Sequence, residues 1–207
     1  MLSSRNILIS IAILCGAITL FWYFFPSTYA IKNYPSSGET IIAFGDSLVQ
    51  GVGSIEGNDF VSLLAARINT PIINLGRSGD TTAEALTRID SVLSKNPKVV
   101  MVLLGGNDFL KRVPKHEMLS NLEKIITTIQ NRGAVVILLG VRGGLITDGY
   151  ESDLKSLAET TGSAYVPNVL KGLIGDPKYM DDSVHPNNAG YVIIADRIYP
   201  VLEKMLK

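Results

Sequence analysis

Cysteine and histidine are scarce in this sequence, and each shortage argues against a class of site. The one cysteine, Cys15, lies in an apolar run near the N-terminus, so no intrachain disulfide can form. The two histidines have no neighbours with the ligand spacing of a metal site, and no phosphate-binding P-loop motif is present. The 19 basic residues balance the 19 acidic ones, so no charge excess points to a nucleic-acid partner.

Charge is also missing from residues 7–25, a continuous apolar run. As a helix rising about 1.5 Å per residue, this run would nearly cross a hydrocarbon core of roughly 30 Å. It exceeds the roughly 7–15 apolar residues of a cleaved signal peptide and ends in the aromatic cluster 21–25. We therefore expect residues 1–30 to form a signal anchor with a transmembrane helix. Cleavage at the poor site 28–30 is the alternative and would give a secreted protein.

The charges beside the apolar run give a weak indication of how this anchor is oriented across the membrane. Arg5 precedes the apolar run, which favours a cytoplasmic N-terminus and a domain outside the cytoplasm, in the periplasm or on the outer face. The polar stretch 31–38 contains Pro35 and Gly38 and is predicted as a linker. Residues 39–207 then suit one domain.

Within that domain, short apolar runs alternate with segments of helical period. The predicted strands are Thr40 to Phe44, Ile72 to Leu75, Val99 to Leu104, Val135 to Leu139 and Ala164 to Val166. The predicted helices lie around Phe60 to Ile68, Ala85 to Leu93, Leu119 to Ile129, Leu154 to Ala158 and Tyr191 to Met205. This order predicts an α/β fold with a parallel sheet between helices, whose functional residues follow the carboxyl ends of the strands.

Ser47 follows the first predicted strand in the sequence Gly45-Asp46-Ser47-Leu48, and we interpret it as a nucleophile. A serine needs a base to take its proton and donors to stabilise the oxyanion that forms during attack. Asp182 and His185 are three residues apart before the last helix, so His185 can serve as the base and Asp182 can orient it.

Donors for an oxyanion follow two other strands. Gly76 and Gly79 come after the second strand and allow a backbone N–H to approach a substrate closely. Asn107 follows the third strand and carries an amide donor. Together with the N–H of Ser47, these groups are the candidates for an oxyanion hole.

Other polar residues have simpler interpretations. His116 is expected on the solvated face of a helix, and Asp46 is expected to bond loop backbone. Asp80 has a helix cap as its alternative role, Arg77 is expected to be solvated, and Asp108 has no chemistry that we can assign.

The stretch Gly51 to Gly57 partly resembles a dinucleotide-binding fingerprint. Its third glycine is one residue late, and Asn74 stands where an acid should end the second strand. We expect these glycines to shape a loop beside the substrate cleft. The loops that should set specificity are residues 108–114 and 142–150.

The four blocks together resemble those of the GDSL or SGNH hydrolases. The quoted blocks are Gly45-Asp46-Ser47-Leu48, Ser78-Gly79-Asp80-Thr81, Leu104-Gly105-Gly106-Asn107-Asp108 and Asp182-x-x-His185-Pro186-Asn187. They are most similar to the branch of bacterial arylesterases and thioesterase/lysophospholipases. The resemblance implies a flavodoxin-like three-layer α/β/α sandwich without metal or organic cofactor.

The same resemblance implies site residues and an activity. The implied triad is Ser47, Asp182 and His185, and the implied oxyanion donors are Ser47, Gly79 and Asn107. We expect a serine esterase that cleaves acyl esters or thioesters of small molecules or lipids through an acyl-enzyme. The alternatives are a carbohydrate O-acetylesterase acting on envelope polysaccharide and a catalytically silent binding module held at the membrane. The sequence does not indicate an oligomeric state.

Overall fold

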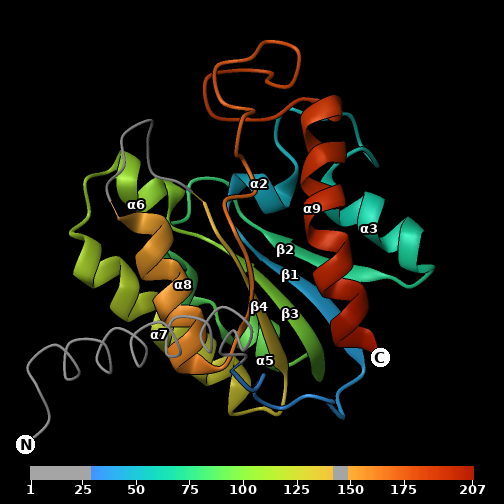
Figure 1. Ribbon diagram of the computed structural model, residues 1–207, viewed down its shortest axis with the longest axis vertical. Helices are drawn as coiled ribbons and strands as arrows, with labels where there is room; N and C mark the ends of the chain where they lie inside the picture. Colours follow the sequence, from blue (N-terminus) through green and yellow to red (C-terminus); the bar gives the residue numbers. More distant parts are fainter. Residues whose placement is uncertain (1–28, 142–148) are drawn as a thin grey trace, which may run out of the picture. The chain divides into compact units, whose positions relative to one another are not determined.

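A computed structural model describes residues 29–141 and 149–207 and contains a five-stranded parallel sheet. The strands lie in the order β2-β1-β3-β4-β5 (Figure 1). They are β1 (Thr40–Gly45), β2 (Ile72–Gly76), β3 (Pro97–Leu103), β4 (Val135–Leu139) and β5 (Ala164–Val166). The predicted α/β fold with a parallel sheet is therefore confirmed. The strand order reverses direction between β1 and β3, which is where sheets of this type bind ligands.

Helices cover both faces of the sheet (Figure 1). The helices are α2 (Ser47–Gln50), α3 (Phe60–Ile68), α4 (Thr82–Thr87), α5 (Asp90–Leu93), α6 (Gly106–Leu110), α7 (Lys115–Gln130), α8 (Tyr150–Thr161) and α9 (Asn188–Leu206). Alternate residues of β3 explain the two layers: Met101 packs towards α3 and α9, whereas Val102 packs towards α7 and α8. Because both faces are buried, the inner strands β1, β3 and β4 consist mostly of apolar residues.

The structure corrects three details of the predicted helices. The segment predicted as one helix around Ala85 to Leu93 is divided into α4 and α5. The short helices α2 and α6 were not predicted, and α6 occupies part of the stretch 108–114 that was expected to be a loop. Helices of four or five residues span too little chain for an apolar periodicity to appear.

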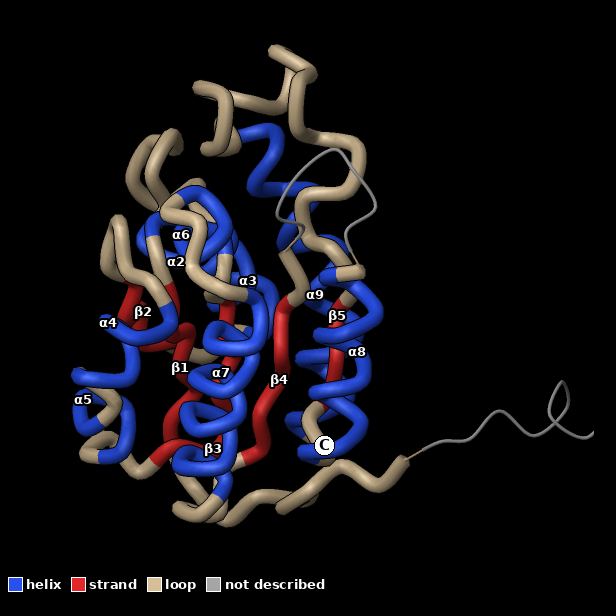
Figure 2. The backbone as a smooth tube through the Cα atoms, turned by 90° about the vertical axis from the view of Figure 1, so that its left-hand side faces the viewer, coloured by secondary structure: helices blue, strands red, loops and turns tan. Residues whose placement is uncertain are grey.

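Residues 31–38, which were predicted as a linker, fall within the compact unit 31–207. The Asn33 side chain donates to the carbonyl of Ala134 at 2.9 Å, and the Ser36 hydroxyl donates to that of Gly133 at 2.9 Å. The segment therefore runs along the amino ends of the strands, at the opposite end of the sheet from Ser47 (Figure 2). These side-chain bonds hold a stretch whose proline and glycine suggested a hinge.

Two predictions lie outside the described residues. They are the membrane-anchor run 7–25 and most of the loop 142–150. Among the residues that are described, no helix combines the length and the apolar character needed to span a bilayer.

Candidate active site

Ser47 is the first residue of α2, directly after β1, and it is 8% exposed. The turn into α2 is tight: a Cβ on Gly45 would lie 2.2 Å from the carbonyl oxygen of Leu103 on β3, so only glycine fits there. Asp46 is the N-cap, and its carboxylate accepts the N–H of Leu48 at 3.0 Å. The sequence thus places the serine at the N-terminal end of α2, at the rim of the sheet.

The structure brings Ser47, His185 and Asp182 into one hydrogen-bonded chain. Nε2 of His185 lies 3.0 Å from Oγ of Ser47, and Nδ1 of the same ring lies 2.7 Å from Oδ2 of Asp182. A proton can therefore pass from the serine hydroxyl to Nε2 while the carboxylate holds the other ring nitrogen as a donor.

The Asp182 carboxylate is bonded by its own loop as well as by the histidine. Its Oδ1 accepts the N–H groups of Val184 and His185 at 2.8 and 2.7 Å. The hydrogen bond with the His185 ring, followed by that with the Val184 N–H, lowers the pKa of Asp182 to about 2. The group is therefore ionised at neutral pH, as the partner of an imidazole base should be.

The glycine-rich stretch after β1 supports the histidine loop. A Cβ on Gly53 would lie 2.5 Å from the carbonyl oxygen of Pro186 and 3.2 Å from Cβ of His185. The buried Tyr191 of α9 donates its hydroxyl to the carbonyl of Val52 at 2.8 Å. Gly53 therefore lets two loops that are distant in sequence pack closely. The stretch 51–57 was predicted to border the substrate cleft, but none of its residues is among those that line the cavity at Ser47.

The two candidate glycines of the second loop occupy different surroundings. Gly76 donates its N–H to the side chain of Asn74 at 2.9 Å, and a Cβ there would lie 2.1 Å from the backbone nitrogen of Gln50. Gly79 lines the cavity at Ser47 and has a φ of +84°. No described residue accepts the N–H of Gly79 or that of Ser47. The geometry thus favours Gly79 over Gly76 as an oxyanion donor.

Asn107 reaches the same place from α6. Its side-chain Nδ2 donates to the backbone carbonyl of Asp80 at 3.0 Å and makes a long contact of 3.5 Å with Oδ2 of Asp46. The first bond fixes the amide. The second is weak enough to be exchanged for a bond to an oxyanion in the cavity.

Asp46 is buried beneath this amide and is 3% exposed. Burial raises its pKa to about 7, despite the opposing effects of the Leu48 N–H and the nearby His185. The neighbouring carboxylates of Asp80 and Asp108 act in the same direction as burial. Asp46 was expected to bond loop backbone, but the N–H that it accepts, that of Leu48, belongs to helix α2. With a pKa of about 7, the Asp46 carboxyl group exchanges its proton near neutral pH next to the candidate donor.

Two buried carboxylates have partners that the sequence did not indicate. Asp80 does not cap α4, because Thr81 does so through a capping box with Glu84. Instead, the Asp80 carboxylate pairs with Arg77 at 2.6 Å and with Arg88 at 2.5 Å.

Asp108, to which we could assign no chemistry, accepts both the N–H and the hydroxyl of Thr82, at 2.9 and 2.6 Å. It therefore joins α6 to the start of α4. A single sequence contains no pattern that would reveal the long-range partners of Asp80 and Asp108.

His116 is exposed on α7, as expected. The Arg77 side chain is about half exposed, and it forms an ion pair with Asp80.

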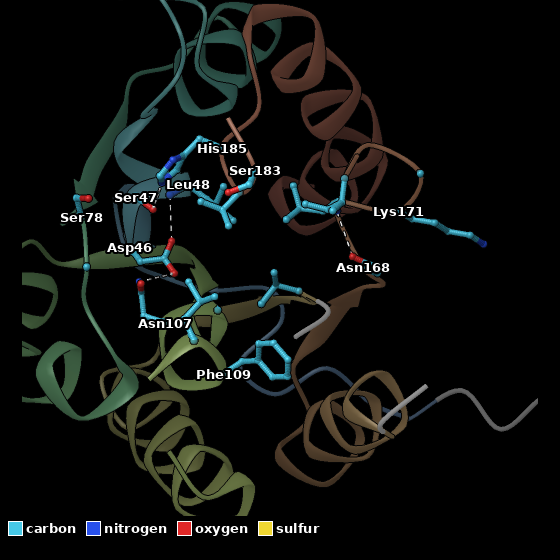
Figure 3. Close-up of a pocket in the computed structure, with 18 residues that line it drawn as sticks. Asp46, Ser47, Leu48, Ser78, Asn107, Phe109, Asn168, Lys171, Ser183 and His185 are labelled. Carbon is cyan, nitrogen blue, oxygen red and sulfur yellow. Dashed lines mark hydrogen bonds between the residues drawn. The ribbon is translucent and has the colours of Figure 1, made fainter. Parts of the chain in front are cut away.

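A cavity of about 510 Å³ opens beside Ser47 (Figure 3). The catalytic-type groups line one part of it, with Ser47 and His185 side by side and Asn107 close to Asp46. The rest of the lining is mostly apolar and comes from α6, the segment after β4 and the loop after β5: Phe109, Leu110, Val141, Leu170 and Ile174. Within the described ranges, no cluster of three or more histidine, cysteine, aspartate or glutamate side chains is placed to hold a metal ion.

Comparison with known proteins yields relatives over most of the chain. The arylesterase of Vibrio mimicus is 31% identical over 190 residues, which cover 86% of this chain and 95% of the relative. Esterase TesA of Pseudomonas aeruginosa is 27% identical over 183 residues, or 83% and 91% of the two chains. The thioesterase 1/protease 1/lysophospholipase L1 of Escherichia coli K12 is 26% identical over 180 residues, or 83% and 86%.

Solved structures give the same picture. The crystal structure of TesA superposes with a TM-score of 0.76 at 28% identity and covers 81% of this chain and 100% of TesA. AlinE4, an SGNH-hydrolase family esterase, superposes with a TM-score of 0.63 at 33% identity and covers 83% and 100% of the two chains. The model of the GDSL-like lipase/acylhydrolase family matches residues 43–193. The chain therefore belongs to the GDSL-like lipase/acylhydrolase family, the SGNH hydrolases, and is a carboxylic ester hydrolase.

Proposed function

We propose that this protein hydrolyses acyl esters or thioesters through Ser47, with His185 as general base and Asp182 as its partner. The observation that carries the proposal is the hydrogen-bonded chain from the serine hydroxyl through both ring nitrogens to the carboxylate. A neutral imidazole at this distance is suited to accept the hydroxyl proton.

In the proposed mechanism, Nε2 of His185 takes the proton of Ser47 while Oγ attacks the acyl carbon. The carbonyl oxygen becomes an oxyanion that accepts hydrogen bonds from the N–H groups of Ser47 and Gly79 and from the Asn107 amide. As the intermediate collapses, His185 returns the proton to the departing alcohol or thiol, which leaves an acyl-enzyme. A water molecule, deprotonated by the same nitrogen, then attacks the acyl-enzyme and releases the acid and the free serine.

The size and lining of the cavity favour substrates whose acyl group is longer than acetyl. Its volume of about 510 Å³ is in the range of pockets that bury whole small ligands, and an acetyl group would fill only a small part of it. The apolar wall beside Ser47 suits a hydrocarbon chain, since burying each methylene contributes about 0.8 kcal/mol. The arylesterase and thioesterase/lysophospholipase names of the relatives are compatible with such substrates.

The first experiment measures hydrolysis of esters and thioesters from acetyl to dodecanoyl, together with a lysophospholipid. We expect the highest kcat/KM beyond acetyl, whereas an optimum at acetyl would favour the carbohydrate O-acetylesterase. Ser47→Ala should abolish both turnover and labelling by a fluorophosphonate, and the control Ser94→Ala should retain both. Full turnover in Ser47→Ala would overturn the proposed mechanism, and absence of any turnover or labelling in the wild type would support the silent binding module.

We further propose that residues 7–25 anchor the domain to a membrane and that the domain lies outside the cytoplasm. The uncharged length of the run and its terminal aromatic cluster support this proposal. Fractionation of the full-length chain should recover it with membranes, and recovery as a shortened, soluble protein would show that the anchor is cleaved.

A further inference from the structure

Arg88 joins the ends of two neighbouring strands behind the candidate oxyanion hole. It caps the C-terminus of α4, and its guanidinium donates in three directions. Nη2 donates to the carbonyl of Gly45 at 2.8 Å, Nη1 to that of Leu75 at 2.9 Å, and Nε to the Asp80 carboxylate at 2.5 Å. The guanidinium carbon lies 4.4 Å from the centre of the Phe44 ring, so the group is also held from one face.

Two of the three hydrogen bonds of Arg88 end close to a proposed oxyanion donor. Gly45 is two residues before Ser47, whose N–H is one donor, and Asp80 directly follows Gly79, whose N–H is another. The third donor, the Asn107 amide, is held by the backbone carbonyl of Asp80 at 3.0 Å. Arg88 is not among the residues that line the cavity, yet its bonds to Gly45 and Asp80 link it to all three donors.

The surroundings make this arrangement hard to replace. The Arg88 side chain is 17% exposed and that of Asp80 is 4% exposed, so the pair is largely shielded from water. A planar guanidinium can reach three acceptors at fixed angles, whereas an ammonium group on the same helix cannot reproduce that fork. Among the described residues, loss of the cation would also leave the buried Asp80 carboxylate with Arg77, which is exposed, as its one ionic partner.

We propose that Arg88 is a positioning residue for the oxyanion hole, an inference that rests on the esterase function proposed above. Its guanidinium fixes the ends of β1 and β2 and the loop of Asp80, from which the donors project. Small displacements of groups that surround a transition state are costly, and a shift of about 1 Å can lower a rate roughly 10²-fold.

Arg77 provides a matched control because it pairs with the same carboxylate from the solvent side, where its side chain is 55% exposed. The test compares Arg88→Lys and Arg88→Met with Arg77→Met, using p-nitrophenyl butyrate and a fluorophosphonate well below the unfolding temperature. For the Arg88 variants we expect kcat and the phosphonylation rate to fall about 10²-fold with KM changed only a few-fold. The Arg77 variant should keep both rates within about two-fold of wild type.

A role limited to stability predicts a different result, namely a lower melting temperature with the kcat of the folded fraction unchanged. Wild-type kcat in folded Arg88→Lys, or an equal loss in Arg77→Met, would overturn the inference. Arg88→Lys keeps the charge and so remains informative if Arg88→Met does not fold. If Ser47→Ala remains active, the proposed function fails; if Ser47→Ala is inactive but Arg88→Lys is fully active, only the positioning role fails.

Discussion

Ser47 and His185 lie 3.0 Å apart but are supported in different ways. The serine follows a strand buried on both faces, and the carboxylates around it, Asp46, Asp80 and Asp108, are all buried. The histidine lies on an irregular loop, where the exposed fraction of the side chain is 19% for His185 and 50% for Asp182. The strand side of the site is thus held by a buried polar network, and the loop side by short-range bonds near the surface.

This difference separates stability from activity. When a buried polar group loses its hydrogen-bond partner, the free energy of unfolding decreases. A half-exposed carboxylate that loses its partner can instead be solvated by water. Substitutions on the strand side should therefore change both stability and catalysis. Substitutions on the loop side should change catalysis alone, and the four predictions below test that distinction.

The largest effect is expected on the loop side, from Asp182→Asn. The amide cannot hold the His185 ring in the needed tautomer, so kcat should fall by up to roughly 10⁴. Urea unfolding at pH 7 should be almost unchanged because the carboxylate is half exposed. The neighbouring exposed Asp181→Asn serves as control and should keep full activity. If kcat falls by less than ten-fold, Asp182 does not have its proposed role.

On the strand side, Asn107→Ala removes one oxyanion donor. We expect kcat to fall roughly 10²–10³-fold with little change in KM, because the bond forms mainly in the transition state. Steady-state kinetics with a short-chain ester measures both constants, and Asn131→Ala, at the exposed end of α7, is the control. An unaltered kcat would show that the contact with Asp46 is not exchanged for the oxyanion.

Asp46→Asn should change how stability depends on pH. In the folded protein the pKa of Asp46 is raised from 3.8 to about 7 by burial, so between these values the folded state holds a proton that the unfolded state has lost. Wild-type stability from this group is therefore highest below about pH 4 and falls as pH rises to about 7, by at most about 4 kcal/mol. Urea unfolding at several pH values should give a flatter curve for Asp46→Asn, and parallel curves would contradict the assigned pKa.

The smallest effect is expected from Thr82→Val, which removes the hydroxyl group that donates a hydrogen bond to the buried Asp108 carboxylate. An unsatisfied buried group typically costs about 1–3 kcal/mol, so the midpoint of urea unfolding should move to lower urea. Thr87→Val in the same helix is the control, because its hydroxyl bonds the exposed carbonyl of Glu84. Equal stability of the two variants would mean that the strand side does not depend on this network.

Features of the fold and the site that depend on residues close together in the sequence were predicted better than those that depend on contacts between distant residues. The strands were predicted to within two residues because burial on both faces leaves an unbroken apolar run, as in Val135 to Leu139. Ser47, Asp182 and His185 were predicted as site candidates because each stands in a short block after a strand or before a helix, and the structure brings them into one hydrogen-bonded chain. The division of the segment after Ala85 into two helices was missed, since apolar residues continue at helical spacing across the break.

Sequence by itself determined the parallel α/β architecture, because local apolar patterns leave few alternatives. It also pointed to Ser47 as the candidate nucleophile and to His185 as the candidate base, because only two histidines are present. Only the tertiary structure showed that Gly76 and Gly79 have different surroundings, that residues 31–38 are bonded to the domain, and that Arg88 lies between Gly45, Leu75 and Asp80. Those outcomes depend on side chains that meet across loops, and a contact between residues far apart in the chain leaves no periodic signal in one sequence.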